Sequence, residues 1–386
     1  MKKAVVAGMI ASYPVGGVAW DYAQYLLGLA ALGFEVMYLE DTGCQTFHPE
    51  TGEDDVDYSV RFLNESLSAL SPPLGRRWHF RAADGRTFGL DFREASRLVR
   101  DADLLLNVSG ATLLRDEYMA CPRKVLVETD PGWNHFVTYP KLDSSQALQN
   151  THSFREHDYF FTYAANAGRP DCRLPLLGLT WYPTRPVVEL DFWHSQLLGE
   201  KWTTVMSWNT YRKPICHDGI TYGAKEIEFA RVESLPRLLN VPLEIAAGGA
   251  SEQVVQQWRK LGWSVQRAQD VSRTADDYRN YIERSRGEFS VAKNIYVATR
   301  SGWFSGRSAC YLAAGLPVVA QDTGFSDFIP NGEGLVTFTS LESAAAAIRA
   351  IESNYAAHQR AARRLAESHF SPSVVLGDLL RRVGVN

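Results

Sequence analysis

One stretch decides the fold: Arg300-Ser-Gly-Trp-Phe-Ser-Gly-Arg-Ser-Ala-Cys-Tyr-Leu-Ala-Ala-Gly-Leu-Pro-Val-Val-Ala320. Its pattern predicts a loop rich in glycine and serine, a short helix that ends at Gly315, and a buried strand. At the start of that helix, residues 305–308 would direct free backbone N–H groups and the positive end of the helix dipole toward an anion. Hydroxyl groups and the guanidinium of Arg307 would add charge-assisted hydrogen bonds, so a diphosphate fits the site. The simpler alternative makes Ser305 an N-cap and Arg307 a solvated residue of the first turn.

Strand and helix patterns alternate on both sides of this stretch. The first forty residues predict a βαβ unit, with an apolar run from Ala4, a helix from Val18 to Leu32 and a strand from Glu35 to Glu40. Such alternation is typical of a parallel sheet that is covered by helices on both faces. Further strands are predicted at 103–108, 124–128, 159–163, 202–206, 243–247, 264–266, 295–298 and 316–320, and the tail from 341 to 385 is predicted to be almost entirely helical.

A proline-rich join divides the chain into two similar halves. Between about 168 and 200 the periodic pattern gives way to a cluster of prolines, which is typical of a domain boundary. We therefore expect one Rossmann-like domain over 1–185 and a second over 190–367. The last segment, 368–386, is expected to be a helix that crosses back to the first domain.

The composition is that of a globular protein and does not favour a polyanionic partner. Forty Lys and Arg residues stand against 44 Asp and Glu residues, which gives a formal net charge of −4 and a pI near 6.2. This balance supplies no general basic surface for nucleic acid or for an anionic membrane. The apolar run from Ala4 to Ala11 is too short and too rich in glycine for a signal peptide or a membrane span.

The cysteines and histidines predict no disulfide framework and no metal centre. The five cysteines contain no C-x-x-C pair and fit buried thiols in a reducing compartment, so we expect a cytoplasmic protein. The nine histidines show neither an H-E-x-x-H pattern nor another ligand spacing, so no metal held by the protein is expected.

The deciding stretch also carries a family resemblance. The segments Ala313-Ala-Gly-Leu-Pro-Val-Val-Ala320, Asp322-Thr-Gly-Phe-Ser-Asp327 and Asn331-Gly-Glu-Gly334 resemble the donor-binding half of GT-B fold glycosyltransferases. The two-halved layout, the loop from Gly8 to Gly17 and the terminal helices extend the resemblance over most of the chain. It implies an α/β protein of two Rossmann-like domains that face each other across a cleft. The first domain would bind the acceptor and the second would bind the sugar nucleotide.

The resemblance also implies a set of donor-binding residues. Residues 305–308 would hold the phosphates, and residues 321–324 would lie near the donor sugar. A loop after the first strand of the second domain would carry a phosphate-binding cation, for which Arg212 is the first choice, with Lys225 and Lys293 behind it; an ordinary surface charge is the alternative. The donor is expected to be a UDP-sugar, with no cofactor required. The full expected set is Gly16, Gly17, Arg212, Ser305, Gly306, Arg307, Ser308, Gln321, Asp322, Thr323 and Gly324.

Two positions depart from the pattern of the retaining members of this family. Those members commonly carry two glutamates in this stretch, and the corresponding positions here are Gly302 and Cys310. Without that pair, an inverting displacement is the simpler mechanism. A general base would remove the proton of the acceptor hydroxyl while the nucleoside diphosphate leaves, stabilised by fixed positive groups instead of a metal.

The catalytic base is sought among acids that follow the strands of the first half, because open α/β sheets bind ligands beyond the carboxyl ends of their strands. Asp21 comes just after Gly16 and Gly17, and its alternative role is to favour the helix dipole. Asp130 precedes a proline, and its alternative role is an Asx turn. Glu40 and Asp41 follow a strand too, but they are expected to cap the next segment. His135 is expected to be structural, with a place in the acceptor site as the alternative.

Four functions are compatible with these patterns. The first is a glycosyltransferase that acts on a hydroxyl of a small molecule or glycan. A sugar-nucleotide epimerase of the same fold, a non-catalytic nucleotide-sugar binder, and a transferase acting on a hydroxyl of a DNA base are the alternatives.

Overall fold

The chain folds into two compact α/β units. The computed structural model describes residues 1–144, 151–195, 199–208 and 213–385. Unit 1 comprises Met1–Tyr163, Pro175–Glu189 and Pro372–Asn386, and unit 2 comprises Ala164–Leu174 and Leu190–Ser371. Ala164–Leu174, which the sequence places in the first domain, clusters with unit 2, and unit 1 resumes at Pro372 instead of at 368.

Unit 1 is built on an eight-stranded sheet with the order β4-β3-β2-β1-β5-β6-β7-β8. All of its strand pairs are parallel except β3 with β4. The central strands β5 and β6 are buried along their whole length, as expected for parallel strands covered on both faces. The strands are β1 (Lys3–Ala7), β2 (Glu35–Glu40), β3 (Trp78–Arg81), β4 (Thr87–Gly89), β5 (Leu104–Val108), β6 (Lys124–Glu128), β7 (Tyr159–Thr162) and β8 (Trp181–Pro183).

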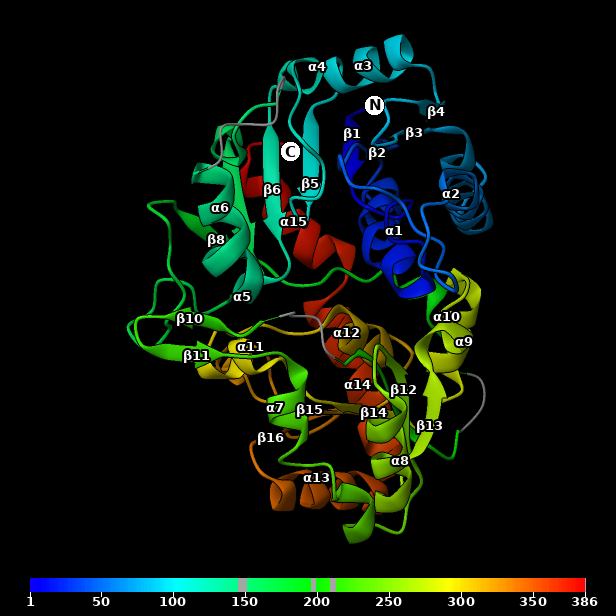
Figure 1. Cartoon of the computed structure of the whole chain (residues 1–386), viewed down its shortest axis with the longest axis vertical. Coiled ribbons are helices and arrows are strands. Elements are labelled where there is room, and N and C mark those ends of the chain that lie inside the picture. Colours follow the sequence, from blue (N-terminus) through cyan, green and yellow to red (C-terminus); the bar gives the residue numbers. More distant parts are fainter. Residues whose placement is uncertain (145–150, 196–198, 209–212, 386) are drawn as a thin grey trace. The chain divides into compact units, whose positions relative to one another are not determined.

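The helices of unit 1 pack on both faces of this sheet (Figure 1). Helix α1 ends as its sequence predicts, because Gly33 adopts a φ of +87° just beyond it. Helix α15 packs against α1, and Pro372 lies beside Gly28. The helices are α1 (Gly16–Ala31), α2 (Val56–Leu70), α3 (Phe92–Arg100), α4 (Asp116–Met119), α5 (Pro131–Trp133), α6 (Tyr139–Ser144) and α15 (Pro372–Arg382), with the short turns η1 (Leu74–Arg76), η2 (Asn134–Thr138) and η3 (Phe154–Glu156).

Unit 2 is built on a six-stranded parallel sheet with the order β13-β12-β9-β14-β15-β16. Numbered along unit 2 alone, this is the 3-2-1-4-5-6 order of a nucleotide-binding Rossmann fold, whose direction reverses between β9 and β14. A separate hairpin pairs β10 with β11. The strands are β9 (Trp202–Ser207), β10 (Ile215–His217), β11 (Ile220–Tyr222), β12 (Leu243–Gly248), β13 (Ser264–Arg267), β14 (Gly287–Ser290), β15 (Val318–Gln321) and β16 (Leu335–Phe338).

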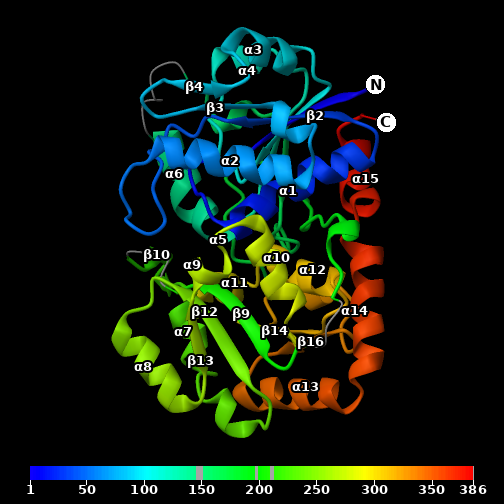
Figure 2. The same ribbon diagram turned by 90° about the vertical axis from the view of Figure 1, so that its right-hand side faces the viewer.

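Helices cover both faces of the unit 2 sheet as well (Figure 2). Trp202 packs with residues of α8 and α13, whereas the next residue, Thr203, contacts Tyr311 of α12 on the opposite face. The helices are α7 (Lys225–Phe229), α8 (Glu252–Leu261), α9 (Ala268–Val271), α10 (Ala275–Glu283), α11 (Asn294–Ala298), α12 (Gly306–Ala313), α13 (Leu341–Ser353) and α14 (Tyr355–His369), with the short turns η4 (Leu190–Phe192), η5 (Leu235–Leu238) and η6 (Phe325–Asp327).

One strand prediction is wrong. Residues 295–298 form α11 instead of a strand, and the strand of this region is β14. Its residues Glu288 and Ser290 are polar but buried, so no apolar run marks β14 in the sequence. The predictions of a βαβ unit at the N-terminus, of strands at β5, β6, β7, β9, β12, β13 and β15, and of a helical tail are confirmed.

Candidate functional site

Helix α12 begins where the sequence predicts a helix start. Ser305 is the N-cap residue and makes no hydrogen bond with its side chain to the helix, and Gly306 is the first helical residue. Ser308 is only 1% exposed, and its Oγ has no hydrogen-bond partner in the described part of the chain. A buried hydroxyl without a partner is costly in free energy.

Arg307 lies at the point where the strand order of unit 2 reverses. Its Nε donates to Glu288 Oε1 at 2.5 Å, its Nη1 to the carbonyl of Val205 at 2.5 Å, and its Nη2 to Ser290 Oγ at 3.0 Å. Val205 belongs to β9, and the other two partners belong to β14. The guanidinium therefore ties α12 to the two strands on either side of the switch point. Direct contact of Arg307 with a phosphate stays a prediction.

Lys225 and Lys293 lie in the surroundings of this arginine. Burial lowers the pKa of Lys225 well below its ordinary value, and the charges of Arg307 and Lys293 lower it further while Glu288 opposes them. Asn294 fixes this neighbourhood, because its Oδ1 accepts from the Gly223 N–H at 3.0 Å. An anion bound here would lessen the repulsion between these cations.

The residues expected near the donor sugar lie at the end of β15 and in the loop that follows it. Gln321 donates to Glu228 Oε2 at 2.6 Å and accepts from the Ala292 N–H, so its amide is held inside unit 2. Asp322 accepts from the Gly324 N–H at 2.8 Å and from Ser326 Oγ at 2.7 Å. Thr323 donates to the Trp303 carbonyl at 2.6 Å. The loop after β15 is thereby linked to the loop before α12.

Gly302 and Cys310, which stand where the retaining members of the family commonly carry glutamates, have different surroundings. Cys310 is buried within α12. Gly302 has a φ of +76°, and a Cβ placed on it would lie 2.9 Å from the backbone nitrogen of Asn166. A side chain at position 302 would therefore need the space that the segment around Asn166 occupies.

In unit 1, the carboxylate of Glu40 binds the loop after β1. Glu40 is fully buried, and its two oxygens accept from the Ala11 N–H at 2.8 Å and the Ser12 N–H at 2.6 Å. Burial raises the pKa of Glu40, although these hydrogen bonds lower it. In nucleotide-binding Rossmann domains a phosphate takes the N–H groups of this loop. Glu40 therefore does not cap the next segment, and Gly16 and Gly17 are the first two residues of α1.

Asp41 has a structural partner. Its carboxylate accepts from Arg115 Nε at 2.5 Å, from Arg115 Nη2 at 2.8 Å and from Tyr118 at 3.0 Å. The expectation that Asp41 caps the next segment is therefore wrong, because this bidentate ion pair joins the end of β2 to α4.

The two candidate bases occupy different surroundings. Asp21 is exposed, and it lies in the second turn of α1 instead of the first. Its negative charge adds to burial in raising the pKa of Tyr25, whose hydroxyl bonds that of Tyr163 at 2.8 Å. Asp130 is half-buried and caps α5, where its Oδ1 accepts from the Trp133 N–H at 3.4 Å. This cap matches the alternative role expected for Asp130.

Sequence reasoning missed a buried titratable pair beside Asp130. Glu128, the last residue of β6, accepts from Asn134 Nδ2 at 2.9 Å and from Thr162 Oγ1 at 2.8 Å. Burial and the charge of Asp130 raise the pKa of Glu128 to about 8. The Nε2 of His135 lies 4.0 Å from Glu128 Oε2, and burial lowers the pKa of His135 to about 4. Because His135 is fully buried, its structural role is the one supported.

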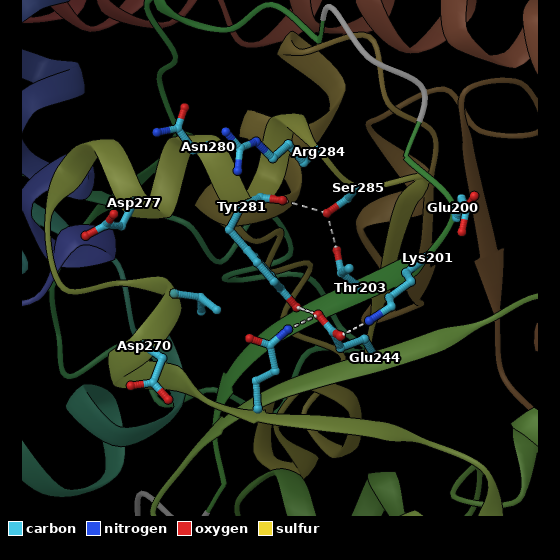
Figure 3. Close-up of a pocket in the computed structure, with 12 residues that line it drawn as sticks. Glu200, Lys201, Thr203, Glu244, Asp270, Asp277, Asn280, Tyr281, Arg284 and Ser285 are labelled. Atoms are coloured by element: carbon cyan, nitrogen blue, oxygen red, sulfur yellow. Dashed lines mark hydrogen bonds and ion pairs between the residues drawn. The ribbon is translucent and has the colours of Figure 1, made fainter.

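A cavity of about 620 Å³ in unit 2 is separate from the predicted donor residues. It lies beside the amino-terminal halves of β9 and β12 and is covered by α9 and α10 (Figure 3). Lys201, Gln266 and Tyr281 all donate to Glu244, at 2.5, 2.8 and 2.9 Å. The buried carboxylate is thus satisfied by the protein itself.

Further predictions concern Arg212, a metal site and a membrane span. Arg212 lies outside the described residues. Within the described residues, no cluster of three or more His, Cys, Asp or Glu side chains is arranged to hold a metal ion. No helix there has both the length and the apolar character needed to cross a membrane.

Comparison with known proteins identifies the fold. No protein-family model and no curated protein sequence matches the chain. An alpha-glucosyltransferase solved with UDP and a 13-mer DNA containing a central A:G mismatch is 11% identical, covers 100% of both chains and has a TM-score of 0.62. AviGT4, a glycosyltransferase involved in Avilamycin A biosynthesis, is 12% identical over 100% of this chain and 97% of its own, with a TM-score of 0.52. A glycosyltransferase from Rickettsia africae ESF-5 is 11% identical over 99% and 97%, with a TM-score of 0.51.

These likenesses establish the fold class. The chain has the α/β fold of two Rossmann-like units that is found in GT-B glycosyltransferases, as the sequence predicts.

Proposed function

We propose that the protein is a glycosyltransferase that moves a sugar from a nucleoside-diphosphate sugar, a UDP-sugar first of all, to a hydroxyl of a small molecule or glycan. The observation that carries the proposal is the N-terminus of α12, where the buried Ser308 hydroxyl has no partner. It stands at the switch point of unit 2, with Lys225, Lys293 and Arg307 nearby. Helix N–H groups, a hydroxyl and cations together suit the leaving diphosphate.

The proposed reaction is a direct, inverting displacement that needs no metal. The acceptor oxygen bonds to the anomeric carbon, the bond from that carbon to the diphosphate oxygen breaks, and the acceptor proton passes to a carboxylate. The fixed positive groups of unit 2 stabilise the charge that develops on the diphosphate. Within the described residues, Ser305, Gly306 and Ser308 are proposed to hold the phosphates, with residues 322–324 beside the sugar.

UDP is the first nucleotide to test, because solved structures of the same fold contain it. One structure of an alpha-glucosyltransferase contains UDP, and another structure contains UDP-glucose and DNA with an abasic site. Unit 1 is proposed to bind the acceptor. Glu40 supports this assignment, because it already takes the N–H groups that a nucleotide phosphate would need there.

A binding and turnover panel tests the proposed function. UDP, GDP, TDP and UDP-glucose are compared by thermal shift, where a ligand at a hundred times its dissociation constant stabilises by about 2.7 kcal/mol. Release of the diphosphate only when an acceptor is added supports the transferase. Conversion of the sugar nucleotide without an acceptor indicates an epimerase, and binding without turnover indicates a non-catalytic binder. A protein that binds none of these ligands contradicts the proposal.

A hydroxyl of a DNA base is the second candidate acceptor. It is favoured by solved structures of the same fold that contain DNA, one of them a 13-mer with an HMU base. The net charge of −4 argues against it. Transfer of radiolabelled sugar to duplex DNA that carries this base, compared with glycan acceptors at two salt concentrations, separates the two candidates.

We expect Ser308→Ala to weaken UDP binding about ten-fold, because a hydrogen bond to a charged group contributes about 1.5 kcal/mol. Isothermal titration calorimetry measures the effect. Ser59→Ala is the matched control, since Ser59 is equally buried and its Oγ has no described partner either, but it lies in α2 of unit 1. Equal affinities in the two variants would remove Ser308 from the site.

We expect Asp21→Asn to lower turnover about a hundred-fold and to leave UDP affinity unchanged, because a positioned general base contributes roughly this factor. Asp21 is preferred to Asp130 because it is exposed, whereas Asp130 caps α5. Turnover is measured as UDP release in both Asp21→Asn and Asp130→Asn. Full activity in the first and loss in the second would transfer the role to Asp130. Retention of configuration in the product, read by NMR, would contradict the direct displacement.

A further inference from the structure

Asn166 joins the two loops that form the proposed donor site. It belongs to Ala164–Leu174, the part of unit 2 that follows β7 in the sequence, and it is fully buried. Its backbone N–H donates to the Ser301 carbonyl at 3.0 Å. Its Nδ2 donates to the carbonyls of Arg300 and Gly324, at 3.0 and 3.3 Å. One side-chain amide thus binds the loop before α12 and the loop after β15.

The backbone around this amide is in unusual conformations. Arg300, Gly302 and Gly324 have φ values of +50°, +76° and +93°. A Cβ on Gly324 would lie 2.5 Å from Asn166 Nδ2, so the amide packs directly on that backbone. A left-handed arginine costs free energy and persists only where its surroundings hold it in place, commonly at functional sites. Asn166 stabilises this conformation of Arg300, because its amide donates to the Arg300 carbonyl.

A charged network fixes the orientation of the amide. Arg169 Nη1 donates to Asn166 Oδ1 at 3.1 Å and to Asp327 Oδ2 at 3.1 Å. Arg300 also pairs with Asp327, and with Asp171 at 3.2 Å. Because a cation faces Oδ1 and two carbonyls face Nδ2, only one orientation of the amide satisfies all of its partners.

We propose that Asn166 is a positioning residue of the donor site. Its amide fixes the position of the loop that leads to Ser305 and Gly306 relative to the loop at Asp322–Gly324. The inference rests on the proposed function for what the two loops bind. The arrangement of the loops themselves does not depend on that ligand. The carbonyls of Arg300 and Gly324 connect the amide directly to both loops. The Gly302 N–H adds a bond to the Thr323 carbonyl at 2.8 Å.

The test is the isosteric variant Asn166→Asp. It keeps the shape but places an oxygen opposite the two carbonyls, so both donated hydrogen bonds are lost. We expect UDP affinity to fall at least ten-fold, and hydrogen exchange to rise in peptides covering 300–306 and 322–326. The matched control is Asn107→Asp in unit 1, where Asn107 is also buried and its Nδ2 donates to the Thr112 carbonyl at 2.8 Å. This control should lower the melting temperature similarly and change UDP affinity less than two-fold.

Two further measurements keep the test decisive. If Asn166→Asp does not fold, Arg169→Ala, an exposed position, is expected to reduce UDP affinity about three-fold and to raise exchange in the same peptides. Unchanged affinity and unchanged exchange in the folded variant would overturn the positioning role, as would equal losses of affinity in Asn166→Asp and Asn107→Asp. If the wild-type protein binds none of UDP, GDP, TDP and UDP-glucose, the proposed function fails, and the exchange data alone decide whether Asn166 holds the two loops.

Discussion

Arg307→Ala is expected to lower the free energy of unfolding by about 3–5 kcal/mol, because removing one partner of a buried ion pair leaves the other charge uncompensated. The charge left behind is Glu288, whose side chain is fully buried. The carbonyl of Val205 and the hydroxyl of Ser290 lose a donor as well. Urea denaturation followed by circular dichroism measures the loss.

Two comparison variants isolate the cause of this loss. Arg86→Ala removes an ion pair whose partners are both exposed, so it is expected to change the free energy of unfolding far less than Arg307→Ala does. The double variant Arg307→Met with Glu288→Gln removes both charges and should recover much of the stability. Equal stability of the wild type and Arg307→Ala would mean that this ion pair does not hold unit 2 together. UDP affinity in the folded variants then measures any direct contact of Arg307 with a phosphate.

The helix start at Ser305–Ser308 could be predicted because local chemistry marks it. Ser305 and Gly306 favour the start of a helix, Gly315 ends it, and an apolar strand follows. The direction of the Arg307 side chain could not be predicted in this way. Arginine is usually solvated or bound to a ligand, and its buried partner Glu288 lies on a strand that the sequence does not mark as one.

Contacts that are distant in the sequence explain the other differences. Glu40 binds N–H groups about 30 residues earlier in the chain, and Asn166 binds Gly324 across 158 positions. Periodicity and spacing describe only neighbours along the chain. They therefore predict elements such as β5 and α1 well, and they predict poorly which polar residue fills which part of a site.

The buried carboxyl at the end of β6 predicts an unusual dependence of stability on pH. Burial raises the pKa of Glu128 to about 8, so the folded protein binds this proton more tightly than the unfolded chain does. The stabilisation is fully present below the ordinary carboxyl pKa, near 4.3, and is lost as the pH rises toward 8. At pH 7 the loss amounts to about 4 kcal/mol, at about 1.4 kcal/mol for each pKa unit.

We therefore expect Glu128→Gln to stabilise the protein by about 4 kcal/mol at pH 7 and to flatten the pH dependence of unfolding between pH 6.5 and 8. His135 does not disturb this window, because burial lowers its pKa to about 4 and it stays neutral. A glutamine can keep the bond from Asn134 and donate to Thr162, whose hydroxyl can also accept. The control Glu53→Gln removes an exposed carboxylate and should leave the wild-type slope intact. If Glu128→Gln and the wild type lose stability in parallel above pH 6.5, Glu128 is ionised in the folded protein, and the charge of Asp130 beside it must then be balanced by another group.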